Sequence, residues 1–283
     1  MGRGYRRYGS KPRRTSMPMP SRTAVGDTVT TEFSTVQEVL DFISPVKSSN
    51  YSVNERYERR FCSFSFHDTI KMLRSGWAEG VRDVAFNTDK INSILDEASG
   101  YAIEYDTAGD YIDMGAYLEG VPECFGKITS AEGPKESVRI VASITASSIV
   151  HEDHIKNRGA AICALIDQLR KTHFVCLDIV VSSRGIMGKN LRTIFHVDMQ
   201  NDYSRDLIAF YLAHPGMLRR IWFAIAEIAL GYDNCITYGS VNEDPSVPGA
   251  INFPSLSSGN WSSIETSTRE VQGILDKFLN SQK

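Results

Sequence analysis

The most regular pattern of apolar and polar positions lies in residues 138–181, which read VRIVASITASSIVHEDHIKNRGAAICALIDQLRKTHFVCLDIVV. An apolar run over 138–145 leads into a turn rich in Ser and Thr, and a second apolar run covers 174–181. Between them, a segment that begins at Glu152 or Asp153 has apolar residues at helical spacing. Its predicted buried face comprises Ile155, Gly159, Ile162, Leu165, Ile166 and Leu169. The pattern predicts one βαβ unit with two parallel strands.

Further strands and helices are predicted toward the C-terminus. Residues 191–199 alternate between apolar and polar positions, which predicts an antiparallel partner or an edge strand. Asp202 or Ser204 can cap the next helix, which Pro215 ends. The remaining predicted elements are helices over 217–230 and 263–279, a short strand over 235–238 and a long surface loop over 242–262.

Residues 27–130 have shorter and less regular patterns. Thr35 predicts the N-cap of a helix over 36–43. The sequence FCSFSF at 61–66 alternates as a strand does. The segments that follow predict helices over 70–74 and 81–98, a hairpin and a short helix over 100–128, and a linker over 130–137.

Together these elements predict an α/β protein in three parts. Residues 1–26 form a disordered basic arm, residues 27–130 an α+β N-terminal region, and residues 138–283 a Rossmann-like region with three layers. The chain has 283 residues, of which 42% are hydrophobic, enough for one large core or two smaller ones. No apolar run approaches the roughly 20 residues that span a bilayer, so no membrane partner is expected. No secretory signal is apparent, which predicts a cytoplasmic location.

Charge is distributed unevenly along the chain. Residues 1–26 contain no acidic residue and carry +7, whereas the whole chain carries −3, so the remainder carries −10. A basic arm on an acidic body predicts contact with nucleic acid, with a membrane surface or with an acidic face of the same protein. We expect any binding to nucleic acid to be non-specific. The candidate residues for it are Arg3, Arg6, Arg7, Lys11, Arg13, Arg14 and Arg22.

A second charged stretch is acidic and rich in tyrosine. It can bind a cation or a basic partner, or it can simply be a solvated face. Its acidic residues are Asp106, Asp110, Asp113, Glu119 and Glu123.

The Ser/Thr turn after the first strand of the βαβ unit is the candidate ligand or partner loop, because α/β proteins collect ligands at the carboxyl edge of a parallel sheet. The turn contains no glycine, so its backbone N–H groups cannot converge on a phosphate, and a nucleotide-binding loop is improbable. Clustered hydroxyl oxygens can instead coordinate a hard cation such as Mg²⁺. The hydroxyl residues are Ser143, Thr145, Ser147 and Ser148.

The spacing of Ser143, Thr145 and Ser147 in S-I-T-A-S resembles the Asp-x-Ser-x-Ser motif of von Willebrand factor A-type domains, where the motif precedes a long helix, a buried strand and an antiparallel edge strand. The resemblance implies a Rossmann-like fold and protein partners bound at the carboxyl edge, sometimes alongside ring ATPases. Ser143 replaces the leading Asp, so the carboxylate that would offset dehydration of Mg²⁺ is missing. We therefore expect no cofactor, with Mg²⁺ as the alternative. A helix cap and turn without a ligand explains the same residues.

Four blocks of sequence carry a second resemblance. They are RSGWAEG at 74–80, MGAYLEGVPECF at 114–125, TASSIVHEDHIKNRGAAICALIDQL at 145–169 and LIAFYLAHPGMLRRIWFAIAE at 207–227. As a set they resemble an uncharacterised protein family of unknown function encoded by tailed bacteriophages and their relatives. The resemblance assigns no role to any residue. It implies a viral origin, with the host cytoplasm or the virion as the place of action.

Residues that could hold a metal or carry out catalysis are few. His151 and His154 lie at i and i+3 of a predicted first helical turn and could share a metal, although a solvated helix N-terminus explains them as well. A metal-dependent enzyme would need carboxylates near the Ser/Thr turn. The acidic residues at predicted strand ends are Asp178, Asp198 and Asp233. No nucleophile motif such as GxSxG is present, and the five dispersed cysteines suggest neither a disulfide framework nor a zinc site.

The expected function follows from the lack of a complete catalytic motif. We expect a phage-encoded, non-catalytic protein-interaction module that acts as an assembly or remodelling adaptor. Its partner would be a protein such as a phage-encoded ATPase or a virion component. One alternative is a nucleic-acid-associated or virion structural protein that uses the basic arm, and a second is a metal-dependent enzyme.

Overall fold

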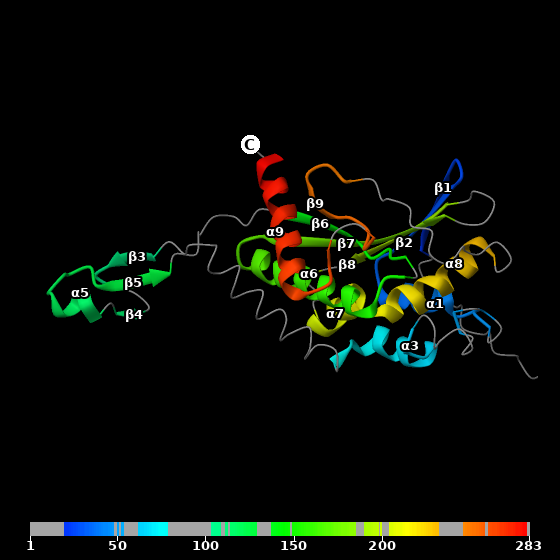
Figure 1. Ribbon diagram of the computed structural model, residues 1–283, viewed down its shortest axis with the longest axis horizontal. Helices are drawn as coiled ribbons and strands as arrows, with labels where there is room; N and C mark the ends of the chain where they lie inside the picture. The colour runs from blue at the N-terminus through cyan, green and yellow to red at the C-terminus, as the bar shows by residue number, and fades with distance from the viewer. Residues whose placement is uncertain are drawn as a thin grey trace, which may run out of the picture.

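The computed structural model describes residues 20–47, 50, 52–53, 62–78, 103–108, 111–112, 114–128, 137–147, 149–184, 190–197, 199, 204–231, 246–257 and 260–281. The main body is a six-stranded sheet with helices packed against it, and a three-stranded sheet lies apart from it (Figure 1). The chain is therefore a mixed α/β protein, as predicted. Within the described residues, no helix is both long enough and apolar enough to cross a membrane.

The predicted βαβ unit is present. β6 (Ser137–Ser143) leads through α6 (Glu152–Thr172) into β7 (Phe174–Arg184), and the two strands are parallel. The helix begins where the sequence predicted, because the His151 side chain accepts a hydrogen bond from the backbone N–H of Asp153 and caps the first turn. The predicted apolar face of α6 packs into the main core.

The main sheet has the strand order β1-β2-β8-β7-β6-β9. Its other strands are β1 (Ser21–Val25), β2 (Thr28–Phe33), β8 (Asn190–Val197) and β9 (Ala250–Phe253). β6 pairs parallel with both β7 and β9, β8 pairs antiparallel with β7, and β2 pairs parallel with β8. β8 is thus the antiparallel partner that the pattern predicted, but it is internal and not an edge strand.

The helices of the main body gather on one face of the sheet (Figure 1). Besides α6 they are α1 (Val36–Ile43), α3 (Phe66–Ser75), α7 (Arg205–Ala213), the π-helix η2 (Met217–Trp222) and α8 (Phe223–Leu230). α9 (Ile264–Ser281) packs against α6 and the edge strand β9. No described helix packs on the opposite face over β7, β8 and β2, so the described residues show two layers here and the predicted third layer is not confirmed. Around Asp178 and His196 this face is polar, whereas Val141 and Val180 on the same face are buried in a small apolar cluster with Ala250.

The N-terminal strands change the predicted division of the chain. β1 lies inside the stretch predicted as a disordered arm, and β2 extends the sheet of the C-terminal region through its pairing with β8. Arg22, predicted to belong to the basic arm, donates from Nη2 to the carbonyl oxygen of Ala229 at 2.5 Å. This carbonyl lies in the last turn of α8, where a cation is favoured by the helix dipole. The boundary near residue 130 therefore does not separate β1, β2, α1 and α3 from the main body.

The strand predicted over 61–66 is wrong. Ser65 caps α3, because its Oγ accepts from the backbone N–H of Asp68 at 3.0 Å, and the helix begins at Phe66. Serine at an N-cap satisfies a free helical N–H, and this local gain overrides the period-two pattern. Gly76 ends the helix with a φ of +81°, and any Cβ at Gly76 would lie 2.5 Å from Cβ of Asp206 on α7.

The predicted surface loop over 242–262 contains the edge strand β9. Ile251 and Phe253 are buried in the core, which the proline-rich composition of the segment concealed. Asn252 fixes the turn before the strand, since its Oδ1 accepts from the backbone N–H of Val247 at 2.8 Å and its Nδ2 donates to the carbonyl oxygen of Val247 at 2.9 Å. The predicted strand over 235–238 and helix over 81–98 lie outside the described residues.

Two arginines of the π-helix η2 donate hydrogen bonds to the backbone of two loops. Arg219 of η2 donates from Nη2 to the carbonyl oxygen of Val150, which follows the Ser/Thr turn, at 2.8 Å. Arg220 donates from Nη1 to the carbonyl oxygen of Ser52 at 3.1 Å. The Oγ of Ser52 in turn donates to Glu227 on α8 at 2.6 Å. The buried charges of this helix are thereby used to hold irregular backbone in place.

The three-stranded sheet has the order β3-β5-β4 and is antiparallel. It consists of β3 (Ile103–Asp106), β4 (Tyr111–Ile112) and β5 (Phe125–Ile128), with the short helix α5 (Met114–Leu118) between the last two. The sequence predicted a hairpin and a short helix here, and both kinds of element are present.

Candidate functional site

The Ser/Thr turn is part of the interior rather than an open loop. Ser143 and Thr145 are buried, and Ser147 is half-buried. The Oγ1 of Thr145 accepts from Ser143 Oγ at 3.1 Å and from the backbone N–H of Ser182 on β7 at 2.9 Å. The carbonyl oxygen of Thr145 accepts from the backbone N–H of Leu256 at 2.8 Å. These two hydroxyls therefore join strands to each other, and Ser148 lies outside the described residues.

The predicted metal ligands His151 and His154 lie at the start of α6. His151 caps α6, its side chain is 72% exposed, and its Nδ1 lies 3.1 Å from a carboxylate oxygen of Asp153. His154 follows one turn later. Within the described ranges no group of three or more His, Cys, Asp or Glu side chains could share a metal ion. The Asp198 and Asp233 predictions fall outside these ranges, as do the arm residues Arg3, Arg6, Arg7, Lys11, Arg13 and Arg14.

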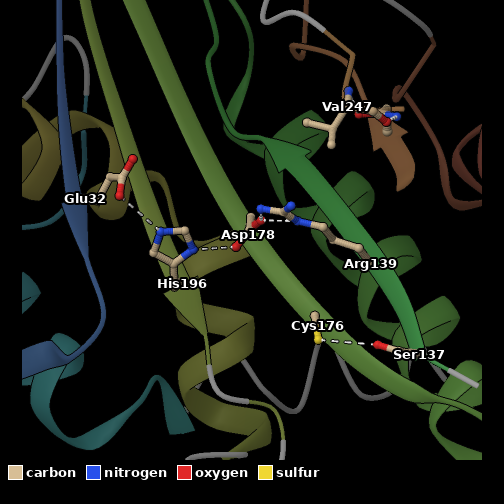
Figure 2. A network of polar contacts seen from close by, with 8 residues as sticks. Glu32, Ser137, Arg139, Cys176, Asp178, His196 and Val247 are labelled. Atoms are coloured by element: carbon tan, nitrogen blue, oxygen red, sulfur yellow. Dashed lines mark hydrogen bonds and ion pairs between the residues drawn. The ribbon is translucent and has the colours of Figure 1, made fainter. Parts of the chain in front are cut away.

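A row of charged side chains runs from β6 to β2 across the face of the sheet on which no described helix packs. Asp178 on β7 lies at its centre, and Arg139 on β6 and His196 on β8 approach it from opposite sides (Figure 2). The Nε of Arg139 donates to Oδ2 of Asp178 at 2.6 Å, and Nδ1 of His196 lies 2.7 Å from Oδ1. Glu32 on β2 completes the row, with its Oε2 3.8 Å from Nε2 of His196. We call these four residues the polar row.

Strand register explains why these residues meet. Asp178 is directly opposite His196 in the antiparallel pair. On the neighbouring parallel strand, Arg139 is opposite Cys176, which lies two residues before Asp178. Side chains at alternate positions of a strand point to the same face, so all of them project from the face that the helices leave open. The row is therefore a consequence of the pairing of four strands, β6, β7, β8 and β2.

The charges of the polar row shift the pKa values of its members. Burial alone raises the pKa of Asp178, but the hydrogen bonds from His196 and Arg139 and their charges outweigh it, so the pKa is lowered. The hydrogen bond to Asp178 raises the pKa of His196 against the opposing effect of burial, and the charges of Asp178 and Glu32 add to the rise. The carboxylate and the imidazolium thus stabilise each other.

A shallow cavity of about 670 Å³ lies over one end of the polar row. Arg139, Asp178 and His196 line it together with Ser34 and Thr35, which precede α1. Its lining also includes the exposed Cys176, whose Sγ lies 3.9 Å from Oγ of Ser137 (Figure 2). The polar row is thus accessible to a partner from the solvent side.

One family model matches residues 12–279 of the chain, and its description is Domain of unknown function (DUF7192). The chain belongs to this family. No curated protein and no solved structure matches it. The family assignment agrees with the prediction of an uncharacterised family. The matched range of the DUF7192 chain runs from before β1 to α9, so one family unit includes both ends of the main sheet.

The polar row of the DUF7192 chain differs in geometry from a catalytic Asp–His pair. An Asp–His pair acts as a catalytic base when the second ring nitrogen of the histidine faces a nucleophile. Here that nitrogen faces the carboxylate of Glu32. Asp178 is also held by Arg139, so its carboxylate is not the free metal ligand that the enzyme alternative required. The row presents fixed charges on an accessible surface.

Sequence reasoning found only Asp178 of the polar row, and it assigned this residue to a strand end. A usable signal was present, because Arg139 interrupts the first apolar run of the βαβ unit and His196 interrupts the later alternating strand. A charged residue inside a strand pattern indicates a face that is not covered by apolar side chains. The pattern predicted that these strands pair, but it did not give their register, which decides which side chains meet.

Proposed function

We propose that this DUF7192 protein is a non-catalytic protein-interaction module, used as an assembly or remodelling adaptor, and that its partner binds the polar row. The proposal rests on one observation, which is that the Arg139 side chain is both accessible and fixed in position. About half of its side chain (51%) is exposed, yet its guanidinium is held by the buried Asp178. The partner surface that fits is one that presents a carboxylate to Arg139.

A fixed arginine is a favourable anchor for a protein partner. Immobilising a long side chain costs free energy on binding, and here the contact with Asp178 has already reduced that freedom. Guanidinium groups form ion pairs with carboxylates through several parallel N–H donors, and arginine is enriched among the residues that dominate binding energy. The contact with Asp178 raises the pKa of His196, which favours a second positive charge next to Arg139.

The order of elements supports a finer proposal about fold. β6, α6, β7 and the antiparallel β8 follow one another as in the von Willebrand factor A-type resemblance. The chain departs from that pattern where β2 pairs with β8 and where Ser143 and Thr145 are buried. We therefore propose the open sheet face, and not the Ser/Thr edge, as the partner site. The phage resemblance favours a phage-encoded ATPase or a virion component as the partner, in the host cytoplasm or the virion.

The test is affinity capture from infected cells with the full chain as bait, after nuclease treatment. Arg139→Gln should lose the captured protein, because the charge that anchors it is gone. Arg269→Gln is the matched control, since Arg269 is an exposed arginine on α9, away from the polar row. A nuclease-resistant partner that binds both variants equally would overturn the assignment to this face.

The nucleic-acid alternative has its own signature in the same experiment. It is favoured by the six basic residues that residues 1–19 carry without any acid. A chain that lacks residues 1–19 keeps β1 and should bind the protein partner as the full chain does. Recovery of nucleic acid alone, lost with this deletion, would replace the adaptor proposal by the nucleic-acid one.

A further inference from the structure

The short helix α5 and its flanks expose an unusual amount of apolar surface. Five of the large apolar side chains that are exposed in the described residues lie within ten positions of one another, and Leu118 is 79% exposed. They are Ile112, Met114, Tyr117, Leu118 and Val121, and we call them the α5 surface. A contiguous exposed apolar stretch of this kind marks an interaction site.

The acidic sequence around the α5 surface indicates that a ligand of this surface would be positively charged. Residues 101–126 contain six acidic residues and no Lys or Arg. Glu119 and Glu123 are exposed directly beside the apolar side chains. A ligand that covers this surface should therefore be basic and should carry apolar or aromatic groups.

One segment of the same chain has this composition. Residues 3–14, RGYRRYGSKPRR, contain six basic residues, no acidic residue, and the aromatic residues Tyr5 and Tyr8. The segment precedes β1, and Figure 1 places β1 and α5 toward opposite ends of the longest axis of the molecule. The segment of one copy is therefore better placed to reach the α5 surface of another copy than its own.

We propose that residues 3–14 of one copy bind the α5 surface of a second copy. Because the two binding elements lie on different parts of the chain, the contact is head-to-tail, and a pair of copies retains one free segment and one free surface. Such a contact forms a ring where the rotation between copies closes and open chains where it does not, and because β1 and α5 lie toward opposite ends of the molecule we expect open chains of increasing length. This assembly uses a different surface from the polar row and stands independently of the proposed function.

Sedimentation velocity of the full, nuclease-treated chain tests the proposal. At about 50 mM NaCl the average mass should rise with protein concentration beyond that of a dimer, and at about 500 mM NaCl the apparent affinity should fall by about tenfold or more, because salt screens the charges. A chain that is monomeric at every concentration, or whose association disappears with nuclease, would overturn the proposal.

Two variants separate the halves of the contact. The segment variant carries Arg6→Glu, Arg7→Glu and Arg13→Glu, and the surface variant carries Leu118→Ser and Glu119→Lys. Each alone should be monomeric, and their equimolar mixture should form a dimer and nothing larger, since one intact segment meets one intact surface. A mixture that stays monomeric, or single variants that still assemble, would refute a head-to-tail contact.

A matched control shows that the effect belongs to the α5 surface. Ile149→Ser with Asp276→Lys removes an apolar side chain that is 90% exposed and reverses an exposed charge, both on the main body. This variant should assemble as the unchanged chain does. Loss of assembly here would show that general surface charge and hydrophobicity, and not the α5 surface, drive the association.

Discussion

Replacing Asp178 by Asn removes the central charge of the polar row with little change of shape. The side chains of Arg139 and His196 are 51% and 37% exposed, so each loses a charge-assisted hydrogen bond that solvent already weakens. We count about 1 kcal/mol for each bond, at the low end of the usual range. Burying a neutral amide is easier than burying a carboxylate, which offsets part of this loss. The free energy of unfolding should fall by about 1–2 kcal/mol.

The effect should depend on pH with a definite sign. Asp178 has a lowered pKa in the folded chain, so its contribution to stability is present above its ordinary pKa and is lost as the pH falls through the folded value. His196 has a raised pKa, so its contribution is present below its ordinary pKa of about 6.5 and is lost as the pH rises through the folded value. The cost of Asp178→Asn should therefore be largest between about pH 4.5 and 6.5.

Urea unfolding of both chains at acidic, intermediate and alkaline pH measures this difference. An NMR titration of His196 in the variant should show its pKa returning toward the ordinary value, because the main cause of the rise is gone. Asp276→Asn on α9 is the control and should stay within about 0.5 kcal/mol. A pH-independent cost, or an unchanged pKa of His196, would refute the account of the polar row.

Three further predictions concern the core. Gly159→Ala would place a Cβ 2.4 Å from Cβ of Ala213, and it should lower the free energy of unfolding by about 3 kcal/mol in urea unfolding. Gly273→Ala has open space around the added Cβ, so it should leave the free energy of unfolding unchanged or raise it by up to about 1 kcal/mol. Thr145→Val should cost about 1–3 kcal/mol, because a buried N–H of β7 loses its acceptor, while partner capture stays intact; a lost partner with unchanged stability would return the Ser/Thr turn to the binding site. Burial, together with the charge of a nearby lysine, lowers the pKa of His214 to about 3, so an NMR titration should find the imidazole neutral at about pH 4.5. As the pH falls from about 6.5 to about 3, this histidine should reduce the free energy of unfolding by up to about 1.4 kcal/mol per pH unit. A titration of His214 at about pH 6.5 would contradict this.

Predictions from the sequence succeeded where a single element carries its own signal. The buried face of α6 and the N-cap at Thr35 both appear as predicted, because helical spacing and capping depend on residues within a few positions of each other. The errors have local causes as well. FCSFSF satisfied the strand pattern, yet Ser65 offered a helix cap that the pattern did not weigh. β9 is short and flanked by turn residues, so its pairing with β6 was invisible in the sequence.

At the candidate site, too, local features were predicted correctly and long-range contacts were not. The Ser/Thr turn was located correctly as the end of a strand, but its hydroxyls serve the packing of that strand against β7. The basic character of the first residues is a property of the sequence, and so is the acidity around α5. Arg22 contacts the last turn of α8 because β1, which contains it, pairs with β2. This contact could not be predicted from the basic character of the segment.

The sequence by itself determined the βαβ unit, most of the helices of the main body and the opposite charges of residues 3–14 and residues 101–126, because each depends on composition or on short-range periodicity. Only the tertiary structure decided that β2 joins β8 and that Arg139, Asp178 and His196 meet on one face of the sheet. Strand order and register are set by contacts between residues far apart in the chain, and no local pattern encodes which strands become neighbours.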